Sequence, residues 1–252
     1  MAKIVSVHSF RGGTGKSNTT ANIVALLAAQ GLRVGVVDTD IQSPGIHILF
    51  GLDESKEMAF SLNDYLYGKC SIEKTAHDVT RKLGANVPGQ VFLVPSSIKA
   101  GEIARYLREG YDPSMLNDGF QNLIDSLNLD VLAIDTHPGL NEETLLSIAI
   151  SDVLVLIMRP DQQDYQGTSV TVEVARKLGV QDMFLVVNKV PQSLNFEDVK
   201  ARVEKTYGCP VAAVVPHSDE MMLLASSGIF ALKYPDSPIT ALFNRIANRI
   251  IR

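Results

Sequence analysis

A segment near the N-terminus, residues 9–20, places Gly12 and Gly13 ahead of a Gly-Lys-Ser triplet that begins at Gly15. Closely spaced glycines let successive backbone N–H groups turn inward around an anion, and a helix that starts directly behind them adds its positive end. In such a loop the ammonium of Lys16 reaches the β- and γ-phosphates of a nucleotide, and the hydroxyl of Ser17 ligates Mg²⁺. The residue types and their spacing therefore predict a phosphate-binding loop.

The segments on either side of the loop support this prediction. Ile4–Val7 has the length and β-branched content of a buried strand, and Ala21–Gln30 is rich in alanine and leucine, as many helices are. The usual loop pattern also has a glycine five residues before Gly15, where this chain has Phe10. The strand before, the helix after and the intact Gly-Lys-Ser triplet nevertheless favour a phosphate loop over a glycine-rich turn with a fortuitous lysine.

Acidic residues follow two other apolar runs of the chain. One run ends in Asp38 and Asp40, and a later run ends in Asp135 with a glycine close behind it. Carboxylates beside a phosphate loop can orient an attacking water and hold the Mg²⁺ shell, and an acid followed by a glycine hinge is typical of a switch loop. An aspartate at a strand end often only caps a helix or a turn, but beside the loop we interpret all three as functional. His137, in the same segment, is interpreted as a loop histidine with no role.

Short apolar runs alternate with segments of helical periodicity along the chain. The strand-like runs are residues 4–7, 34–38, 91–95, 131–135, 153–158, 183–188 and 211–215. The helix-like segments are residues 21–30, 103–109, 115–127, 168–178 and 196–207. Because near-continuous apolar strands separated by helices form parallel sheets, we expect an α/β fold with a doubly wound, mostly parallel sheet and helices on both faces. No linker-like stretch divides residues 1–252, so we expect a single domain with its site at the carboxyl ends of the strands.

Composition narrows the class of protein. The two cysteines, Cys70 and Cys209, lie far apart and outside any Cys-x-x-Cys pattern, which argues against a disulfide framework or a metal cluster and favours a reducing cytoplasm. No run reaches the roughly 18 apolar residues of a membrane-spanning helix. The net charge is -5, yet residues 200–252 carry seven basic side chains against four acidic ones. We interpret this tilt as a solvated face, with binding to a polyanion such as DNA as the alternative.

Five motifs in chain order resemble those of the deviant Walker A ATPases of the ParA/MinD family. They are Gly-Gly-Thr-Gly-Lys-Ser, Val-Val-Asp-Thr-Asp, Ile-Asp-Thr-His-Pro-Gly, Val-Val-Asn-Lys and Val-Val-Pro-His-Ser, and they extend over nearly the whole chain. The resemblance implies a P-loop domain that binds ATP and Mg²⁺, closes into a homodimer around two nucleotides, and hydrolyses ATP slowly until an activating adaptor protein stimulates it. Members of the family position plasmids, chromosomes, division sites or protein cargo. The resemblance implies a cytoplasmic protein that acts along the nucleoid or a membrane, and the basic side chains of residues 200–252 give a weak lean toward DNA over the membrane.

By motif matching, the resemblance also implies roles for individual residues. The residues that would bind the nucleotide are Gly12, Gly13, Thr14, Gly15, Lys16, Ser17, Asn18, Asn188 and Pro216. Among them Asn188 would read the adenine base, with Pro216 packed beside it. The residues implied in catalysis are Arg11, Lys16, Asp38 and Asp40. The residues implied in metal binding are Ser17 and the Walker B acid Asp135, which would hold Mg²⁺ through water.

One position departs from the family pattern. The family has a signature lysine directly before the paired glycines, which reaches across the dimer to the partner's phosphates, and this chain has Arg11 there. Arginine keeps the positive charge but is longer, planar and bidentate, so the replacement is not equivalent. We expect Arg11 to project from the loop and to act in trans as an arginine finger does. The alternative is a surface arginine in an ion pair with an acid such as Asp135 or Glu142.

Other functions on the same fold stay open. A MinD-like, membrane-associated division-site regulator would carry an amphipathic basic helix beyond the domain, whereas residues 239–252 have the apolar spacing of the domain's own last helix. An ATP-binding regulatory scaffold with little hydrolysis is the alternative that Arg11 suggests, and a biosynthetic ligase would need a second substrate pocket. Iron–sulfur reductases and metal carriers of this fold need cysteines near the switch loop, which the sequence lacks.

Overall fold

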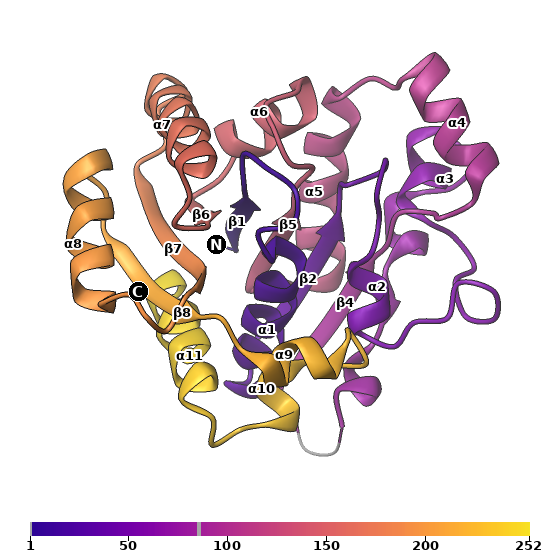
Figure 1. The fold of residues 1–252 in the computed structure, drawn as a ribbon. Coiled ribbons are helices and arrows are strands. Elements are labelled where there is room, and N and C mark those ends of the chain that lie inside the picture. The colour runs from indigo at the N-terminus through magenta and orange to yellow at the C-terminus, as the bar shows by residue number, and fades with distance from the viewer. Residues whose placement is uncertain (1, 85–86) are drawn as a thin grey trace.

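The strands of the chain form one sheet in the computed structural model, which describes residues 2–84 and 87–252 (Figure 1). The order of the sheet is β3-β4-β2-β5-β1-β6-β7-β8, and its neighbours are parallel except for β3 and β4. The bounds of the strands are β1 Lys3–His8, β2 Arg33–Asp38, β3 His77–Asp78, β4 Gln90–Val94, β5 Val131–Asp135, β6 Val153–Met158, β7 Asp182–Val190 and β8 Val211–Pro216. Strands β2 to β5 lie on one side of β1 in the sheet, and β6, β7 and β8 lie on the other side. The carboxyl end of β1 is therefore where the strand order reverses, which is where open α/β sheets bind ligands.

Helices cover both faces of this sheet (Figure 1). Their bounds are α1 Lys16–Ala29, α2 Ile46–Leu49, α3 Leu62–Leu66, α4 Ala100–Glu109, α5 Ser114–Leu127, α6 Glu142–Ala149, α7 Gln162–Lys177, α8 Phe196–Tyr207, α9 Asp219–Leu224, α10 Phe230–Lys233 and α11 Pro238–Ile250, with 3-10 turns at Ile72–Thr75 and Thr80–Leu83. Side chains of α1, α10 and α11 pack on one face, while α5, α7 and α8 pack on the other. The expected fold class, a doubly wound and mostly parallel α/β sheet, is confirmed.

Strand β6 shows why the sequence forms a buried strand. Its residues Val153 and Ile157 join the core that contains α1, whereas Leu154 and Met158 join the core under α7 and α8. Successive side chains of a strand point to opposite faces, so a strand covered on both faces must be apolar at every position. The uninterrupted run Val-Leu-Val-Leu-Ile-Met meets this requirement.

Predicted and observed elements differ mainly at helix starts. The first helix begins at Lys16, not at residue 21, and α7 begins at Gln162, not at residue 168. The start of α7 is fixed by Asp161, whose side chain accepts the backbone N–H of Asp164 at 3.0 Å and so caps the helix. The two-residue strand β3, the eight-residue helix α6 and the shorter helices α2, α3, α9 and α10 were not predicted, because elements of this length show no clear periodicity.

The last helix is a core element, as its spacing predicted. Its residues Ile239, Phe243, Ile246 and Ile250 are buried against α1 and the sheet. Within residues 2–84 and 87–252, none of the helices combines the length and the apolar character needed to cross a membrane.

Candidate nucleotide-binding site

The glycine-rich loop connects the carboxyl end of β1 to the N-terminus of α1. Gly13 and Gly15 have φ angles of 76° and 91°, in the left-handed region that favours glycine. A Cβ at Gly15 would also lie 2.5 Å from the side-chain nitrogen of Asn188, so both conformation and space require glycine there. Gly15 is the N-cap of α1, and Lys16 and Ser17 open the first turn. The loop therefore has the form that presents backbone N–H groups and a helix N-terminus to an anion.

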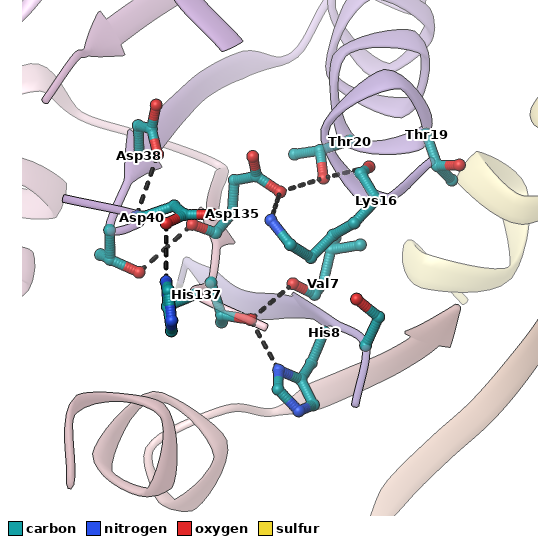
Figure 2. A network of polar contacts seen from close by, with 12 residues as sticks. Val7, His8, Lys16, Thr19, Thr20, Asp38, Asp40, Asp135 and His137 are labelled. Carbon is teal, nitrogen blue, oxygen red and sulfur yellow. Dashed lines mark hydrogen bonds and ion pairs between the residues drawn. The ribbon is translucent and has the colours of Figure 1, made fainter. Parts of the chain in front are cut away.

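Lys16 forms a buried ion pair with Asp135 behind the loop (Figure 2). Its Nζ donates to Oδ1 of Asp135 at 2.7 Å, and the two side chains are 7% and 1% exposed. Oγ1 of Thr20 donates to the same oxygen at 3.1 Å. Oδ2 of Asp135 is buried and has no hydrogen-bond partner among the described residues. Sequence reasoning missed Thr20, although its place four residues after Lys16, on the same helix face, was a usable signal.

Asp38 lies beside Asp135 because β2 and β5 pair in register at these two residues. The Asp38 side chain is buried, and its two oxygens accept the backbone N–H groups of Asp40 at 3.0 Å and Gly45 at 3.2 Å. Burial, followed by the neighbouring Asp135 carboxylate, raises the pKa of Asp38 to about 8 against the opposing effect of Lys16. Asp38 is therefore mostly protonated at neutral pH, and a cation bound at this strand end would favour its ionised form.

The donor set around Lys16 fits Mg²⁺ shared with a phosphate ligand. Among residues 2–84 and 87–252, no three His, Cys, Asp or Glu side chains converge closely enough to hold a metal by themselves. Mg²⁺ keeps several of its waters and is commonly bound by one or two protein oxygens together with substrate phosphates. The unpartnered Oδ2 of Asp135 and the hydroxyl of Ser17, which is half-buried at the start of α1, are oxygens of this kind.

Asp40 contacts a histidine to which the sequence gave no role. Nδ1 of His137 lies 2.6 Å from Oδ1 of Asp40, and the same oxygen accepts the backbone N–H of Ser43 at 3.1 Å (Figure 2). The interpretation of His137 as a loop histidine without a role needs correction, because its ring helps to fix the direction of this carboxylate. The contact joins residues 97 positions apart, so no local pattern could have indicated it.

A second histidine ties β1 to β5 at the level of the site (Figure 2). Nδ1 of His8 lies 2.8 Å from Oγ1 of Thr136, and that hydroxyl donates to the carbonyl of Val7 at 3.1 Å. Since the hydroxyl hydrogen is used on Val7, the nitrogen of His8 must be the donor in the first contact. Burial, and then the charge of Lys16, lower the pKa of His8 to about 3, so the ring is neutral at physiological pH.

A pocket of about 390 Å³ next to the loop brings together the residues expected around the base. Asn18, Asn188 and Pro216 line it, and Met221 adds an apolar side chain. Nδ2 of Asn188 donates to the carbonyl of Thr14 at 2.8 Å, which joins the pocket wall to the phosphate loop. The structure thus places the expected base-binding residues and the loop in one continuous site.

Backbone strain is concentrated around this pocket. Lys189, Ala225 and Ser226 line it and are non-glycine residues with φ angles of 57°, 47° and 60°. Such conformations cost on the order of 1–3 kcal/mol each and gather at ligand sites. Nζ of Lys189 also donates to the carbonyl of Gly13 at 2.8 Å, so the strained turn after Asn188 supports the loop.

Arg11 does not project freely from the loop. Its side chain is 36% exposed, and Nη1 lies 3.3 Å from Oδ1 of Asp161 and 3.3 Å from Oδ1 of Asp164, both at the start of α7. Asp164 is 2% exposed and also accepts the backbone N–H and Nε of Arg159 at 2.8 and 3.2 Å. The expected free projection is therefore wrong for the single chain. The alternative of an ion pair is right in kind, but its partners are not Asp135 or Glu142.

Comparisons with known proteins agree with this geometry. A family model described as the CobQ/CobB/MinD/ParA nucleotide binding domain matches residues 5–231. An uncharacterized ATP-binding protein of Methanocaldococcus jannaschii is 28% identical over 252 residues, which is 100% of this chain and 88% of that protein. The septum site-determining protein MinD of Pyrococcus horikoshii, solved with Mg-ADP, superposes with a TM-score of 0.80 at 21% identity, covering 99% of this chain and 96% of that one. Cobyrinic acid a,c-diamide synthase of Mycobacterium smegmatis, solved with ADP and magnesium, gives 0.76 at 20% identity, with coverages of 100% and 95%. The chain therefore belongs to the CobQ/CobB/MinD/ParA family of nucleotide-binding domains.

Proposed function

We propose that this protein is a Mg²⁺-dependent ATPase that dimerises with ATP and positions or partitions a cargo in the cytoplasm. The observation that carries the proposal is the buried Lys16–Asp135 pair behind the glycine loop, with Asp38 and Asp40 at the neighbouring strand end. Membership in a nucleotide-binding family supports it, as do the ADP and magnesium bound by the two solved relatives. The septum site-determining role of the Pyrococcus relative supports the positioning of a cargo.

In this proposal the site binds the nucleotide at two places. The backbone of the loop and the ammonium of Lys16 bind the phosphates, and the pocket of Asn188 and Pro216 binds the adenine. Lys16 turns from Asp135 toward the phosphates, while Ser17 and, through water, Asp135 hold Mg²⁺. When bound, Mg²⁺ neutralises charge that develops on the phosphate oxygens.

Asp40 is the residue that we propose to orient the attacking water. Its side chain stands at the open end of β2, and the contact of 2.6 Å with His137 fixes the direction of its carboxylate. Asp38 accepts the backbone N–H of Asp40 and so holds the same turn from behind. A carboxylate fixed on two sides has little freedom left to lose when it orients a water.

Dimerisation would bring Arg11 to the partner's phosphates, and an adaptor protein would stimulate hydrolysis. A dimer also doubles the basic side chains of residues 200–252, which favours DNA over a membrane as the matrix. Because Arg11 is bound by Asp161 and Asp164 of its own chain, an ATP-binding scaffold with little hydrolysis is the second candidate. A biosynthetic ligase is the third, since the Mycobacterium relative has such an activity on the same fold.

Three measurements on the purified chain separate these functions. Titration with a fluorescent ATP analogue, with Mg²⁺ or with EDTA, should show Mg²⁺-dependent binding that Lys16→Ala abolishes and that the exposed control Lys74→Ala leaves unchanged. Light scattering should then show a dimer with ATP and not with ADP, and phosphate release should be slow but measurable. Dimerisation without phosphate release would indicate the scaffold. Binding without dimerisation, followed by release only with a second substrate, would indicate the ligase, and no binding of ATP would refute the proposal as a whole.

A further inference from the structure

Phe10 occupies the position where phosphate loops usually have a glycine, and its ring lies against Gly167 of α7. A Cβ at Gly167 would lie 2.7 Å from Cε1 of the ring and closer still to Cδ1 and Cγ. Real Cβ atoms essentially never approach another atom to less than 3.0 Å. Gly167 is buried within the helix, so the ring of Phe10 fills the space that a side chain at this position would need.

The backbone of α7 gives no other reason for a glycine at position 167. Gly167 has the φ of a helix, whereas Gly13 and Gly15 of the phosphate loop lie in the left-handed region. In a helix interior glycine is less favourable than every other residue except proline, so an alanine there would stabilise the helix. The close approach of Phe10 therefore accounts for the glycine.

Phe10 and Arg11 contact two successive turns of the same helix. Arg11 pairs with Asp164, and Gly167 follows Asp164 by three residues. Positions three residues apart lie on one face of a helix, so both contacts are made to the face of α7 that borders the loop. The first residues of the phosphate loop are thus attached to α7 at two adjacent points.

The two contacts differ in what can break them. The side chain of Arg11 is 36% exposed, so salt screens its ion pairs and a phosphate can compete for its guanidinium. The contact of Phe10 with Gly167 is apolar, and it depends on the fit of the ring and not on charge. When Arg11 leaves Asp161 and Asp164, the ring of Phe10 therefore still holds the loop backbone against α7.

We propose that Phe10 is a positioning residue whose packing on Gly167 keeps the loop in the form that binds the phosphates of ATP while Arg11 moves toward a dimer partner. This inference rests on the proposed function, which supplies ATP as the ligand and the role of Arg11 in trans. A loop that is already held in its bound form loses little conformational freedom when the nucleotide arrives, so the packing of Phe10 raises the affinity for ATP. Phe10 is then a functional departure from the usual loop pattern.

The test is a double-mutant cycle that is measured in nucleotide affinity. The full chain is titrated with a fluorescent ATP analogue and Mg²⁺, and its free energy of unfolding is measured in urea, for the wild type, Phe10→Ala, Gly167→Ala and the double variant. Each single substitution should weaken binding about tenfold, because a loop displaced by about 1 Å loses the alignment of several phosphate contacts at once. In the Phe10→Ala background Gly167→Ala should have no further effect on affinity, since no ring is left to displace.

Gly119→Ala is the matched control for the glycine substitution. Gly119 is a buried glycine of α5, and a Cβ there would lie 3.0 Å from the ring of Tyr65. It therefore reproduces a tight contact between a helix glycine and an aromatic ring outside the phosphate loop. This variant should change the free energy of unfolding and leave the affinity for the ATP analogue unchanged.

Hydrogen exchange without nucleotide gives a measurement that does not depend on ATP. Backbone amides of residues 9–15 should exchange faster in Phe10→Ala than in the wild type, while those of α11 should not change. If the wild type does not bind the ATP analogue, the proposed function fails, and the exchange of residues 9–15 alone decides whether Phe10 positions the loop. If Gly167→Ala does not fold, Phe10→Ala, which removes atoms and adds none, is used for both measurements.

Three results would overturn the inference. One is a cycle in which Phe10 and Gly167 are coupled in the free energy of unfolding and not in nucleotide affinity, which would mean that the contact only stabilises the fold. Another is wild-type affinity in Phe10→Ala. The third is an unchanged exchange rate of residues 9–15 in Phe10→Ala, because the ring would then have no influence on the loop.

Discussion

Asp38 should make the stability of this protein depend on pH in a direction opposite to that of most carboxylates. Its side chain is buried, lies in register with Asp135, and accepts the backbone N–H groups of Asp40 and Gly45. Burial and the Asp135 charge raise its pKa from 3.8, the ordinary value that holds in the unfolded chain, to about 8. Below pH 3.8 both states hold the proton, so the group has no effect on stability. Between the two pKa values the folded chain keeps a proton that the unfolded chain has lost, so the free energy of unfolding falls as pH rises.

The Asp38→Asn variant converts this argument into a measurable difference. The free energy of unfolding of the wild type falls by about 1.4 kcal/mol for each pH unit between the two pKa values of Asp38, and it stays constant above the higher value. Asparagine does not titrate, but its amide nitrogen cannot accept the N–H of Gly45, which removes a hydrogen bond worth about 1 kcal/mol. We therefore expect Asp38→Asn to be close to the wild type in stability near pH 5 and more stable by about 2–3 kcal/mol near pH 7.

The assay is urea unfolding followed by circular dichroism at several pH values, with EDTA and without nucleotide. The quantity to plot is the difference in free energy of unfolding between Asp38→Asn and the wild type against pH. Asp236→Asn, which neutralises an exposed carboxylate on the loop before α11, is the matched control and should give a flat difference. A flat difference for Asp38→Asn as well would refute the reasoning, because it would mean that Asp38 is ionised in the folded chain throughout this range.

Substitutions of Lys16, Gly15 and Arg11, with their controls, test the site further. Lys16→Ala should abolish binding of a fluorescent ATP analogue and lower the free energy of unfolding by about 3 kcal/mol, since it leaves its carboxylate partner buried and unpaired; near wild-type affinity would contradict this. Gly15→Ala should weaken ATP binding in the same titration, because the new Cβ would collide with the side-chain amide of Asn188. The control Gly31→Ala, at a φ of 95° with open space around it, should lower only the melting temperature. Arg11→Ala should keep monomer affinity within about a few-fold but lose ATP-driven dimerisation in light scattering, and Arg11→Lys should restore part of it; an alanine variant that dimerises normally would rule out the trans role.

The sequence was sufficient for the seven parallel strands of the sheet and for the phosphate loop, because both are determined locally. A strand that is covered on both faces must be apolar along its length, so the runs at residues 131–135 and 153–158 are recognisable without knowledge of their neighbours. The loop glycines have the same property, since Gly13 and Gly15 are required by their own φ angles. The helix starts were less accurate, because a cap such as Asp161 shifts the boundary by several residues without changing the periodicity.

The contacts that organise the site could not be predicted, because they join segments that are distant in the sequence. The Asp38–Asp135 neighbourhood follows from the register of β2 against β5, and register is a property of the assembled sheet. The contact of His137 with Asp40 and that of Arg11 with Asp164 likewise depend on where the loops after β5 and β6 lie. Residue type alone gave candidates for chemistry, and only the fold determined which candidates meet.

The ion pairs of Arg11 are compatible with a role on a partner molecule, because Asp164 does not depend on Arg11 alone. Asp164 is nearly fully buried, and a buried carboxylate that loses its only partner costs several kcal/mol. Here it keeps the backbone N–H of Arg159 at 2.8 Å and the Nε of the same residue at 3.2 Å when Arg11 departs. Asp161 is 44% exposed, and its Oδ2 keeps the guanidinium of Arg159 at 3.2 Å, so the pair that it loses is worth no more than about 1 kcal/mol. Breaking the ion pairs of Arg11 with Asp161 and Asp164 therefore requires little free energy. Charge-assisted hydrogen bonds from Arg11 to a phosphate of a dimer partner, at about 1.5–3 kcal/mol each, would exceed this free energy.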